Sequence, residues 1–282
     1  MIKTICVAGA GTMGSGIALV AAQSGFNTLL FDLNQQALEK SITSIQNNIQ
    51  HIVDKQKITV SEGAIIFKRI QFISDANKCI ADLFIEAIME KADAKIALFN
   101  QFASLNNAGV ILATNTSSLS VSAIQAGIVH PERVVGMHFF NPAPVMKLVE
   151  VVKGKQTSGT TAQTIYGLCK AMGKTPVHCN DSPGFIVNRV ARHYYLEAMK
   201  IVESGIATIE TVDALMEASG FKMGPFKLMD LIGMDINLAV SKSIYEAFNH
   251  PERFAPSPLQ EEKVAKGELG RKTGKGFYTY TS

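Results

Sequence analysis

Residues 2–14 read IKTICVAGAGTMG, and this stretch decides the fold. Its first part, Ile2–Ala8, is apolar and rich in β-branched side chains, which predicts a buried strand. A G-x-G-x-x-G pattern occupies residues 9–14, and Ser15–Gln23 then has the composition of a helix. The chain therefore predicts a strand that ends in a tight glycine turn and passes directly into a helix.

The residues around this turn predict a dinucleotide-binding unit. Thr28–Phe31 is expected to form the next strand, and Asp32 stands at its end, close to the spacing of roughly 20 residues that such units show. Gly9 permits the tight turn, Gly11 lets the backbone approach a pyrophosphate, and Gly14 allows the helix to pack closely on the strand. Asp32 can accept hydrogen bonds from both ribose hydroxyls and would repel a 2′-phosphate, so NAD is expected rather than NADP. An ordinary glycine-rich turn is the alternative.

Strands and helices continue to alternate after this unit. Further strands are expected at Ile70–Ile73, Leu83–Glu86, Val110–Thr114, Val134–His138, Leu148–Val152 and Thr175–Cys179. Helices are expected between them at Lys91–Leu105, Val121–Ala126 and Ala162–Met172. This alternation predicts an α/β fold, a Rossmann-like doubly wound sheet with a mostly parallel core.

One segment interrupts the alternation. Apolar residues in Gln35–Ile52 recur every three or four positions, which predicts a long amphipathic helix. A second, short helix is expected near Ser61–Phe67, so that the two form a helical hairpin inserted into the sheet domain. Lysines on this hairpin, such as Lys55, could meet an anionic ligand, although such lysines more often form a solvated face.

The composition changes near Pro183 and Gly184, a pair that breaks regular structure. Beyond this pair the sequence is helical, with helices expected at Phe185–Glu203, Ile209–Ala218, Leu228–Phe248 and Leu259–Lys266. We therefore expect residues 1–183 to form the Rossmann-like domain and residues 184–282 to form an all-α C-terminal domain.

Composition and charge narrow the class of protein. The 282 residues are 47% hydrophobic, which is enough for a substantial core, and the net charge of +3 is too small to indicate nucleic acid as a partner. The four cysteines have no metal-type spacing, so free thiols and no metal site are expected. No apolar run approaches the roughly 20 residues that cross a bilayer, and the N-terminal apolar run is too short for a signal peptide. A soluble, cytoplasmic protein is expected.

A histidine and a glutamate stand on consecutive strands. The stretch 133–152 reads RVVGMHFFNPAPVMKLVEVV, in which His138 ends one expected strand and Glu150 lies on the next. A carboxylate on the neighbouring strand can hold one ring nitrogen, fix the tautomer and raise the basicity of the histidine. This pattern is typical of a general base. A buried histidine that pairs with a carboxylate for structural reasons is the alternative.

Ligands of open α/β sheets bind beyond the carboxyl ends of the strands, and polar residues stand there. Asn115 follows the strand Val110–Thr114, and its amide suits the ribose or the carboxamide of a nicotinamide cofactor. Ser117 offers a hydroxyl that can donate and accept. Capping of the next helix is the alternative use of these serines, and we assign it to Ser118 or Ser120.

Two further polar residues are candidates for the same edge. Glu86 ends the strand Leu83–Glu86. Asn188 lies in the first turns of the helix that follows the expected domain boundary, where an amide could reach back to a ligand. Taken alone, Asn188 would more often have a structural role.

Seven motifs, in order, resemble the short-chain L-3-hydroxyacyl-CoA dehydrogenases, and bacterial 3-hydroxybutyryl-CoA dehydrogenases in particular. They are GAGTMGSGIA, FIEAIME, TNTSSLS, HFFNPAPVMKLVEV, DSPGFIVNR, GPFKLMDLIGMD and RKTGKGFY, and they span essentially the whole chain. The resemblance implies an NAD-dependent oxidoreductase that interconverts (S)-3-hydroxyacyl-CoA and 3-oxoacyl-CoA thioesters in fatty-acid or butanoate metabolism. It also implies a homodimer whose contacts lie in the C-terminal domain.

The resemblance implies roles for individual residues as well. His138 resembles the general acid/base of the family, and Glu150 resembles the carboxylate that orients it. Ser117 and Asn188 resemble the residues that bind the substrate oxygen and complete the catalytic pocket. Positions that match the cofactor site are Gly9, Gly11, Gly14, Asp32, Glu86, Lys91 and Asn115. Lys55 lies roughly where the family has a basic residue near coenzyme A.

Two alternatives share part of this pattern. Dehydrogenases of free 3-hydroxy acids have a similar sheet and helical domain but depend on a catalytic lysine, and this sequence has His138 and Glu150 instead. Some relatives are structural proteins that bind the cofactor without catalysis. The catalytic positions of this sequence do not depart from the family pattern, so they give no indication of a structural role. A fold alone, however, does not fix a function.

Overall fold

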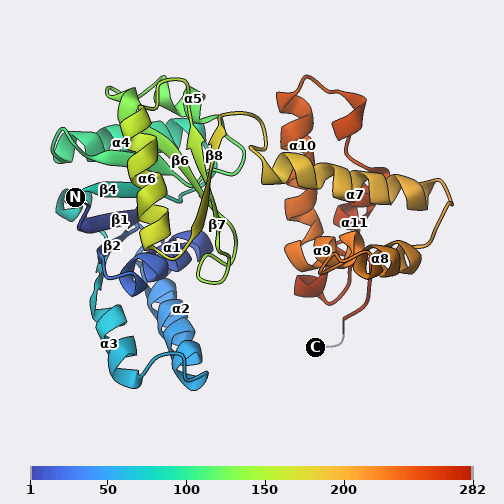
Figure 1. The fold of residues 1–282 in the computed structure, drawn as a ribbon, viewed down its shortest axis with the longest axis horizontal. Helices are drawn as coiled ribbons and strands as arrows, with labels where there is room; N and C mark the ends of the chain where they lie inside the picture. The colour runs from blue at the N-terminus through green and yellow to red at the C-terminus, as the bar shows by residue number, and fades with distance from the viewer. Residues whose placement is uncertain (1, 281–282) are drawn as a thin grey trace. The chain divides into compact units, whose positions relative to one another are not determined.

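The computed structural model describes residues 2–280 (Figure 1). The chain divides into two compact units, Met1–Asp181 and Ser182–Ser282. The first unit is an α/β layer structure, and the second is helical. The expected fold class is confirmed.

The first unit is built on a sheet whose strands follow the order β3-β2-β1-β4-β5-β6-β7-β8. Their bounds are β1 Thr4–Ala8, β2 Asn27–Phe31, β3 Ile70–Ile73, β4 Leu83–Glu86, β5 Ile111–Thr114, β6 Val134–Phe139, β7 Leu148–Lys153 and β8 Thr175–Asn180. Neighbouring strands pair in parallel except β6 and β7, which are antiparallel. The carboxyl ends of β1, β2, β4, β5 and β6 therefore meet at one edge of the sheet, where ligands of such folds bind.

Among the described residues of this unit, six α-helices lie against the sheet or project from it (Figure 1). They are α1 Thr12–Gln23, α2 Gln35–Asp54, α3 Val60–Lys68, α4 Ala92–Leu105, α5 Val121–Gln125 and α6 Gly159–Ala171. The expected hairpin is formed by α2 and α3, and it extends away from the sheet. Leu38, Ile45 and Ile49 form the buried face of α2, and Ile49 lies against Gly63 of α3.

The core of the first unit surrounds β1. Ile5, Val7 and Ala8 have no exposed surface, because the strand lies between β2 and β4 and is covered by helices. α1 packs on this strand with almost no space to spare: a methyl group at Gly14 would lie 1.7 Å from the carbonyl oxygen of Gly9. Glycine is therefore required at position 14 for the helix to reach the strand.

The helices of the second unit are α7 Val187–Glu203, α8 Ile209–Ala218, α9 Pro225–Ile232, α10 Met234–Ala247 and α11 Pro258–Ala265. α9 packs against α7, α8 and α10. The fully buried side chains of Phe226, Met229 and Met234 fill this contact. Burial of each such side chain contributes roughly 1.5–3 kcal/mol to stability.

The prediction of one continuous helix over Leu228–Phe248 is wrong. α9 ends at Ile232, and α10 begins at Met234. Gly233, between them, has φ +102°, a backbone conformation that L side chains rarely adopt and that interrupts the helix. The apolar periodicity on both sides of Gly233 is strong, and it concealed the break.

Within residues 2–280 no helix has the length and apolar character that a bilayer crossing requires. The same residues contain no group of three or more histidine, cysteine or carboxylate side chains arranged to hold a metal ion.

Candidate active site

The glycine turn has the geometry of a dinucleotide site. Gly9 has φ +102°, and a methyl group there would lie 2.5 Å from the carbonyl oxygen of Ala87, so the turn tolerates only glycine at this position. A methyl group at Gly11, in contrast, would meet no atom within 4 Å. Open space therefore lies over the backbone of Gly11, where a pyrophosphate would approach.

α1 begins at this open space. Its N-cap is Gly11, and among the described residues no side chain caps the helix. The first turn of an α-helix carries backbone N–H groups without intrahelical partners and attracts anions. The structure thus offers donors to a phosphate at the position that the sequence indicates.

Asp32 is fixed beside the same turn. One carboxylate oxygen accepts the N–H of Ala10 at 2.8 Å, and the other accepts the N–H of Asn34 at 2.8 Å. These bonds hold the carboxylate at the end of β2, next to the glycine turn. The residues of this region therefore fit the adenosine half of NAD.

His138 and Glu150 lie opposite each other on the antiparallel strands β6 and β7. The Nδ1 atom of His138 lies 2.7 Å from a carboxylate oxygen of Glu150. Glu150 has no exposed surface, and His138 is 5% exposed. The carboxylate can thus stabilise a positive imidazolium, and a bond at Nδ1 makes Nε2 the nitrogen that would exchange a proton with a ligand.

The loop after β5 places Asn115 and Ser117 near the end of β6. The amide oxygen of Asn115 accepts the backbone N–H of Phe139 at 2.9 Å, so Asn115 links this loop to the residue after His138. Both Asn115 and Ser117 are half-buried. Ser120 caps α5 by accepting the N–H of Ala123, as the sequence suggested.

Glu86 ends β4 and is completely buried. Its carboxylate accepts the Lys95 ammonium at 2.6 Å, the Ile88 N–H at 2.7 Å and the Thr114 hydroxyl at 2.7 Å. All of these partners belong to the first unit. The structure therefore gives Glu86 a clear structural task, and its predicted contact with the cofactor stays a prediction.

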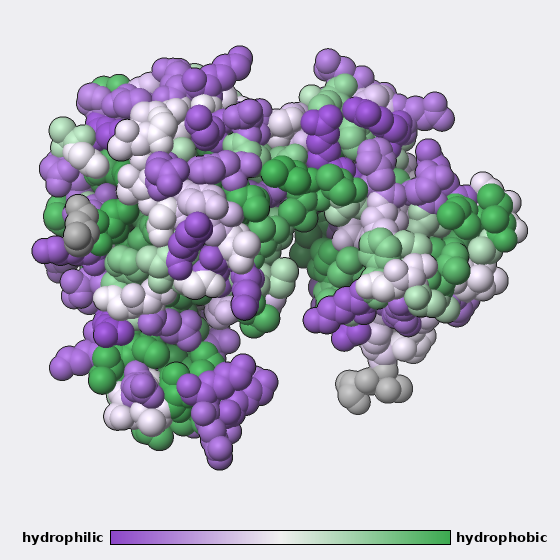
Figure 2. Space-filling model, in the orientation of Figure 1, coloured by the Kyte–Doolittle hydropathy of each residue, from purple (hydrophilic) through white to green (hydrophobic). Residues whose placement is uncertain are grey.

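Three other predicted site residues lie on helices or at helix ends. Lys91 is exposed at the N-cap of α4, close to the edge that carries Glu86. Lys55 is exposed at the C-cap of α2, far along the hairpin, where hydrophobic and hydrophilic residues lie side by side on the surface (Figure 2). Asn188 is the second residue of α7 in the second unit and is half-buried.

Two residues near Ser117 escaped the sequence analysis. Lys95, in the first turns of α4, is 1% exposed and contacts both Glu86 and Glu90. Glu90 accepts hydrogen bonds from Thr116, Ser117 and Ser118. Burial would raise the pKa of Glu90, but the Lys95 ammonium and the hydroxyl groups of Thr116 and Ser118 outweigh burial and lower the pKa. The signal that the sequence offered for Glu90 was its position four residues after the end of β4.

Lys174 is a third residue that the sequence did not single out. Its ammonium donates to the backbone carbonyls of Ala143 at 2.5 Å and Met146 at 2.9 Å, both in the loop that follows His138. Burial lowers the pKa of Lys174. The same loop packs on α1, since a methyl group at Gly16 would lie 3.2 Å from Ala143.

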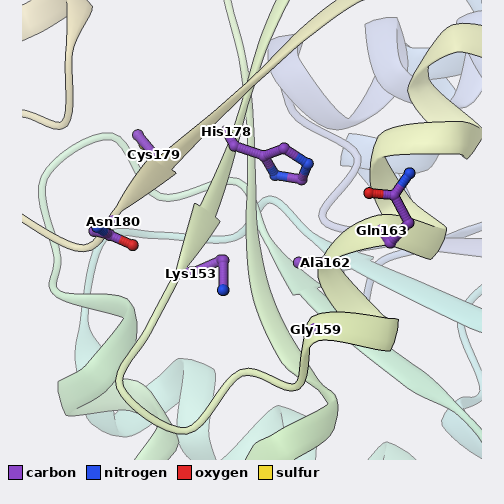
Figure 3. Close-up of a pocket in the computed structure, with 7 residues that line it drawn as sticks. All are labelled: Lys153, Gly159, Ala162, Gln163, His178, Cys179 and Asn180. Carbon is purple, nitrogen blue, oxygen red and sulfur yellow. The ribbon is translucent and has the colours of Figure 1, made fainter.

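A separate groove of about 410 Å³ lies between α6 and the edge strand β8 (Figure 3). Its side chains include Lys153, Gln163, His178 and Asn180, and none of the predicted site residues lines it. Burial, followed by the charges of Glu150 and Asp181, raises the pKa of the Cys179 thiol on β8 to about 12. A raised pKa disfavours the thiolate, which is the reactive form of cysteine.

Taken together, the glycine turn, the fixed Asp32 and the buried His138–Glu150 pair are features expected of an NAD-binding dehydrogenase. Comparison with known families makes the class specific. Residues 4–182 match the model of the 3-hydroxyacyl-CoA dehydrogenase NAD binding domain, and residues 184–280 match that of the 3-hydroxyacyl-CoA dehydrogenase C-terminal domain. The chain belongs to the 3-hydroxyacyl-CoA dehydrogenase family, as its motifs suggested.

Relatives support this assignment over the full chain. The chain is 46% identical, over 99% of its length, to 3-hydroxyadipyl-CoA dehydrogenase of Escherichia coli and covers 59% of that protein. It is 41% identical to a probable 3-hydroxybutyryl-CoA dehydrogenase of Bacillus subtilis, over 99% of this chain and 98% of the relative. The crystal structure of (S)-3-hydroxybutyryl-CoA dehydrogenase PaaH1 from Ralstonia eutropha is similar, with a TM-score of 0.95, 37% identity and complete coverage of both chains.

Proposed function

We propose that this chain interconverts (S)-3-hydroxybutyryl-CoA and acetoacetyl-CoA, with His138 and Glu150 as its acid/base pair. The observation that carries the proposal is the buried bond between His138 and Glu150 at the ligand edge of an NAD-binding sheet. Family membership supplies the substrate class, a 3-hydroxyacyl thioester of coenzyme A.

In this proposal His138 moves the proton of the 3-hydroxyl group. During oxidation Nε2 removes that proton, and during reduction the imidazolium returns it to the ketone oxygen. NAD, which the glycine turn and Asp32 would hold, would supply the hydride chemistry at carbon 3. General acid/base assistance of this kind typically contributes about 10²–10⁴-fold to a rate.

Glu150 keeps the charged imidazole in place. Because the carboxylate is excluded from water, its attraction to the imidazolium is weakly screened, and the bond to Nδ1 prevents the ring from turning. Ser117 would donate to the substrate oxygen from the half-buried loop after β5. Asn188 would add a second polar contact, an assignment that rests on the motif DSPGFIVNR alone.

Asp32 and the glycine turn would select and hold NAD. The carboxylate lies where the ribose hydroxyls of the adenosine half would bind, and its charge would repel a 2′-phosphate. Glu86 and Asn115 would act on the site through the strands and loops that they hold together.

The substrate assignment can be tested by comparing thioesters with the free acid. The purified protein is expected to consume NADH rapidly with acetoacetyl-CoA and not with acetoacetate. One relative is named for an adipyl thioester, so 3-oxoadipyl-CoA is assayed beside acetoacetyl-CoA. A higher kcat/KM for 3-oxoadipyl-CoA would show that the preferred acyl group is not the proposed one. No consumption with any thioester, while NADH still binds, would refute the proposal in favour of a non-catalytic relative.

A further inference from the structure

One carboxylate oxygen accepts hydrogen bonds from the backbone around Ser117. The Oε1 atom of Glu90 accepts the N–H of Ser117 at 3.1 Å and the N–H of Ser118 at 3.3 Å. It also accepts the Ser118 hydroxyl at 3.0 Å and the Thr116 hydroxyl in a short bond. The Thr116 hydroxyl in turn accepts the N–H of Leu119 at 2.8 Å. Every residue from 116 to 119 is thus tied, directly or through one hydroxyl, to Glu90.

Lys95 fixes the other end of this carboxylate. Its ammonium lies 3.0 Å from Oε2 of Glu90 and 2.6 Å from Oε1 of Glu86. Lys95 and Glu86 are 1% and 0% exposed, whereas the Glu90 side chain is 36% exposed. A glutamate with that much exposure would ordinarily sample several rotamers, but here Oε2 pairs with the Lys95 ammonium and Oε1 accepts the hydrogen bonds of the loop.

Glu86 joins the same cluster to the sheet. Its second oxygen accepts the hydroxyl of Thr114, and that hydroxyl accepts the N–H of Thr116 at 3.2 Å. The cluster of Glu86, Lys95 and Glu90 therefore holds both the start and the middle of the loop. Hydrogen bonds to charged groups are roughly twice as strong as neutral ones, and a satisfied buried network favours one geometry over its neighbours.

We propose that Glu90, anchored by Lys95, is a positioning residue that sets the place of Ser117 for catalysis. The inference rests on the proposed function, because it is the role of Ser117 in binding the substrate oxygen that makes its position matter. Glu90 acts here through the backbone of Ser117 and not through contact with the reacting atoms. Misplacement of a polar group by about 1 Å can cost on the order of 10²-fold in rate.

Glu90→Ala and Glu90→Gln are the informative variants. Glu90→Ala removes the acceptor but leaves Lys95 paired with Glu86, so no buried charge loses all its partners and the fold is expected to persist. Glu90→Gln retains an acceptor oxygen and is the conservative rescue. Asp82→Ala is the matched control, because Asp82 precedes the opposite end of β4 and accepts two backbone N–H groups, those of Lys3 at 2.8 Å and Thr4 at 2.9 Å.

The first readout needs no substrate. Amide hydrogen exchange of Ser117 and Ser118 is expected to become at least about tenfold faster in Glu90→Ala, to recover largely in Glu90→Gln and to stay unchanged in Asp82→Ala. Unchanged exchange in Glu90→Ala would overturn the inference whether or not the protein is a dehydrogenase.

The second readout is a double-mutant cycle on kcat/KM with acetoacetyl-CoA. Glu90→Ala alone is expected to lower kcat/KM on the order of 10²-fold, and its effect in a Ser117→Ala background is expected to be several-fold smaller. Asp82→Ala should have the same small effect in both backgrounds. Full additivity of Glu90→Ala and Ser117→Ala in an active enzyme would overturn the inference. An inactive wild type would refute the proposed function, and the exchange experiment would still decide whether Glu90 fixes Ser117.

Discussion

Replacement of Glu150 by glutamine tests the electrostatic part of the proposed mechanism. Glu150→Gln keeps the size of the side chain and a polar atom beside Nδ1 of His138 but removes the negative charge. The two groups are 2.7 Å apart at their nearest atoms, so their charge centres lie about 4 Å apart. With an effective dielectric constant of about 20, opposite charges at that distance attract by about 4 kcal/mol.

That attraction stabilises the imidazolium, which forms only when His138 has taken up the proton. Since each 1.36 kcal/mol corresponds to a tenfold change in rate, complete loss would lower kcat by about 10³-fold. The amide recovers part of the interaction, so a decrease of about 10²–10³-fold is expected. The assay is NADH formation at saturating (S)-3-hydroxybutyryl-CoA and NAD, the direction in which His138 takes up the proton. The dissociation constant of NADH is measured separately by fluorescence and is expected to stay within about twofold.

The chain provides a matched control in the pair His130 and Glu132. These side chains are 3.6 Å apart and 52% and 51% exposed, so water screens their attraction. Glu132→Gln is expected to leave kcat within about twofold. A kcat for Glu150→Gln that is also within a few-fold of wild type would refute the argument that a buried charge at this position drives the proton transfer.

Three further perturbations have defined outcomes. Asp32→Ala should reduce the preference for NADH over NADPH by at least about tenfold in kcat/KM, and an unchanged preference would remove Asp32 from cofactor selection. Gly233→Ala should lower the free energy of unfolding in urea by about 1–3 kcal/mol, because φ is +102° there; Gly159→Ala, at a helical position with no atom within 4 Å of the added methyl, should not. Hydrogen bonds from Lys263 and Lys275 lower the pKa of Glu268 from 4.5 to about 2. The ionised carboxylate therefore stabilises the fold fully above pH 4.5, and this stabilisation is lost as the pH falls toward 2. The stability difference between wild type and Glu268→Gln should therefore be constant near neutral pH and shrink over that acid range.

Much of the fold could be predicted because its signals are local. The apolar runs of β3 and β4 and the periodicity of α8 coincide with the elements, and the glycine turn identifies β1 and α1. The predicted ends of other elements differ from the observed ends by one to a few residues, because a cap such as Ser158 before α6 depends on a single hydrogen bond. The break at Gly233 could not be recognised because one glycine within a strong apolar repeat is also compatible with a continuous helix.

The candidate site was predictable where residues follow strand ends. His138, Asp32 and Ser117 lie on or follow apolar runs whose carboxyl ends share an edge. Glu150 reaches the same edge because it lies near the start of β7, which runs antiparallel to β6. Glu90 and Lys95 were not singled out. The partners of Glu90 lie on the loop after β5, with Ser117 27 residues further along the chain, and the position of Glu90 behind a strand end does not identify them. Lys95 pairs with two carboxylates close to it in the sequence, but an isolated lysine near acidic residues is usually exposed. The same holds for Lys174, whose two carbonyl partners lie roughly 30 residues earlier and carry no signal in the sequence.

The central claim is that His138 transfers the substrate proton, and His138→Gln tests it most directly. NADH consumption with acetoacetyl-CoA is measured for this variant beside wild type and His130→Gln, which alters an exposed histidine. The account predicts a loss of about 10²–10⁴-fold for His138→Gln alone, with NADH binding near normal in all three proteins. Turnover of His138→Gln within a few-fold of wild type would contradict it.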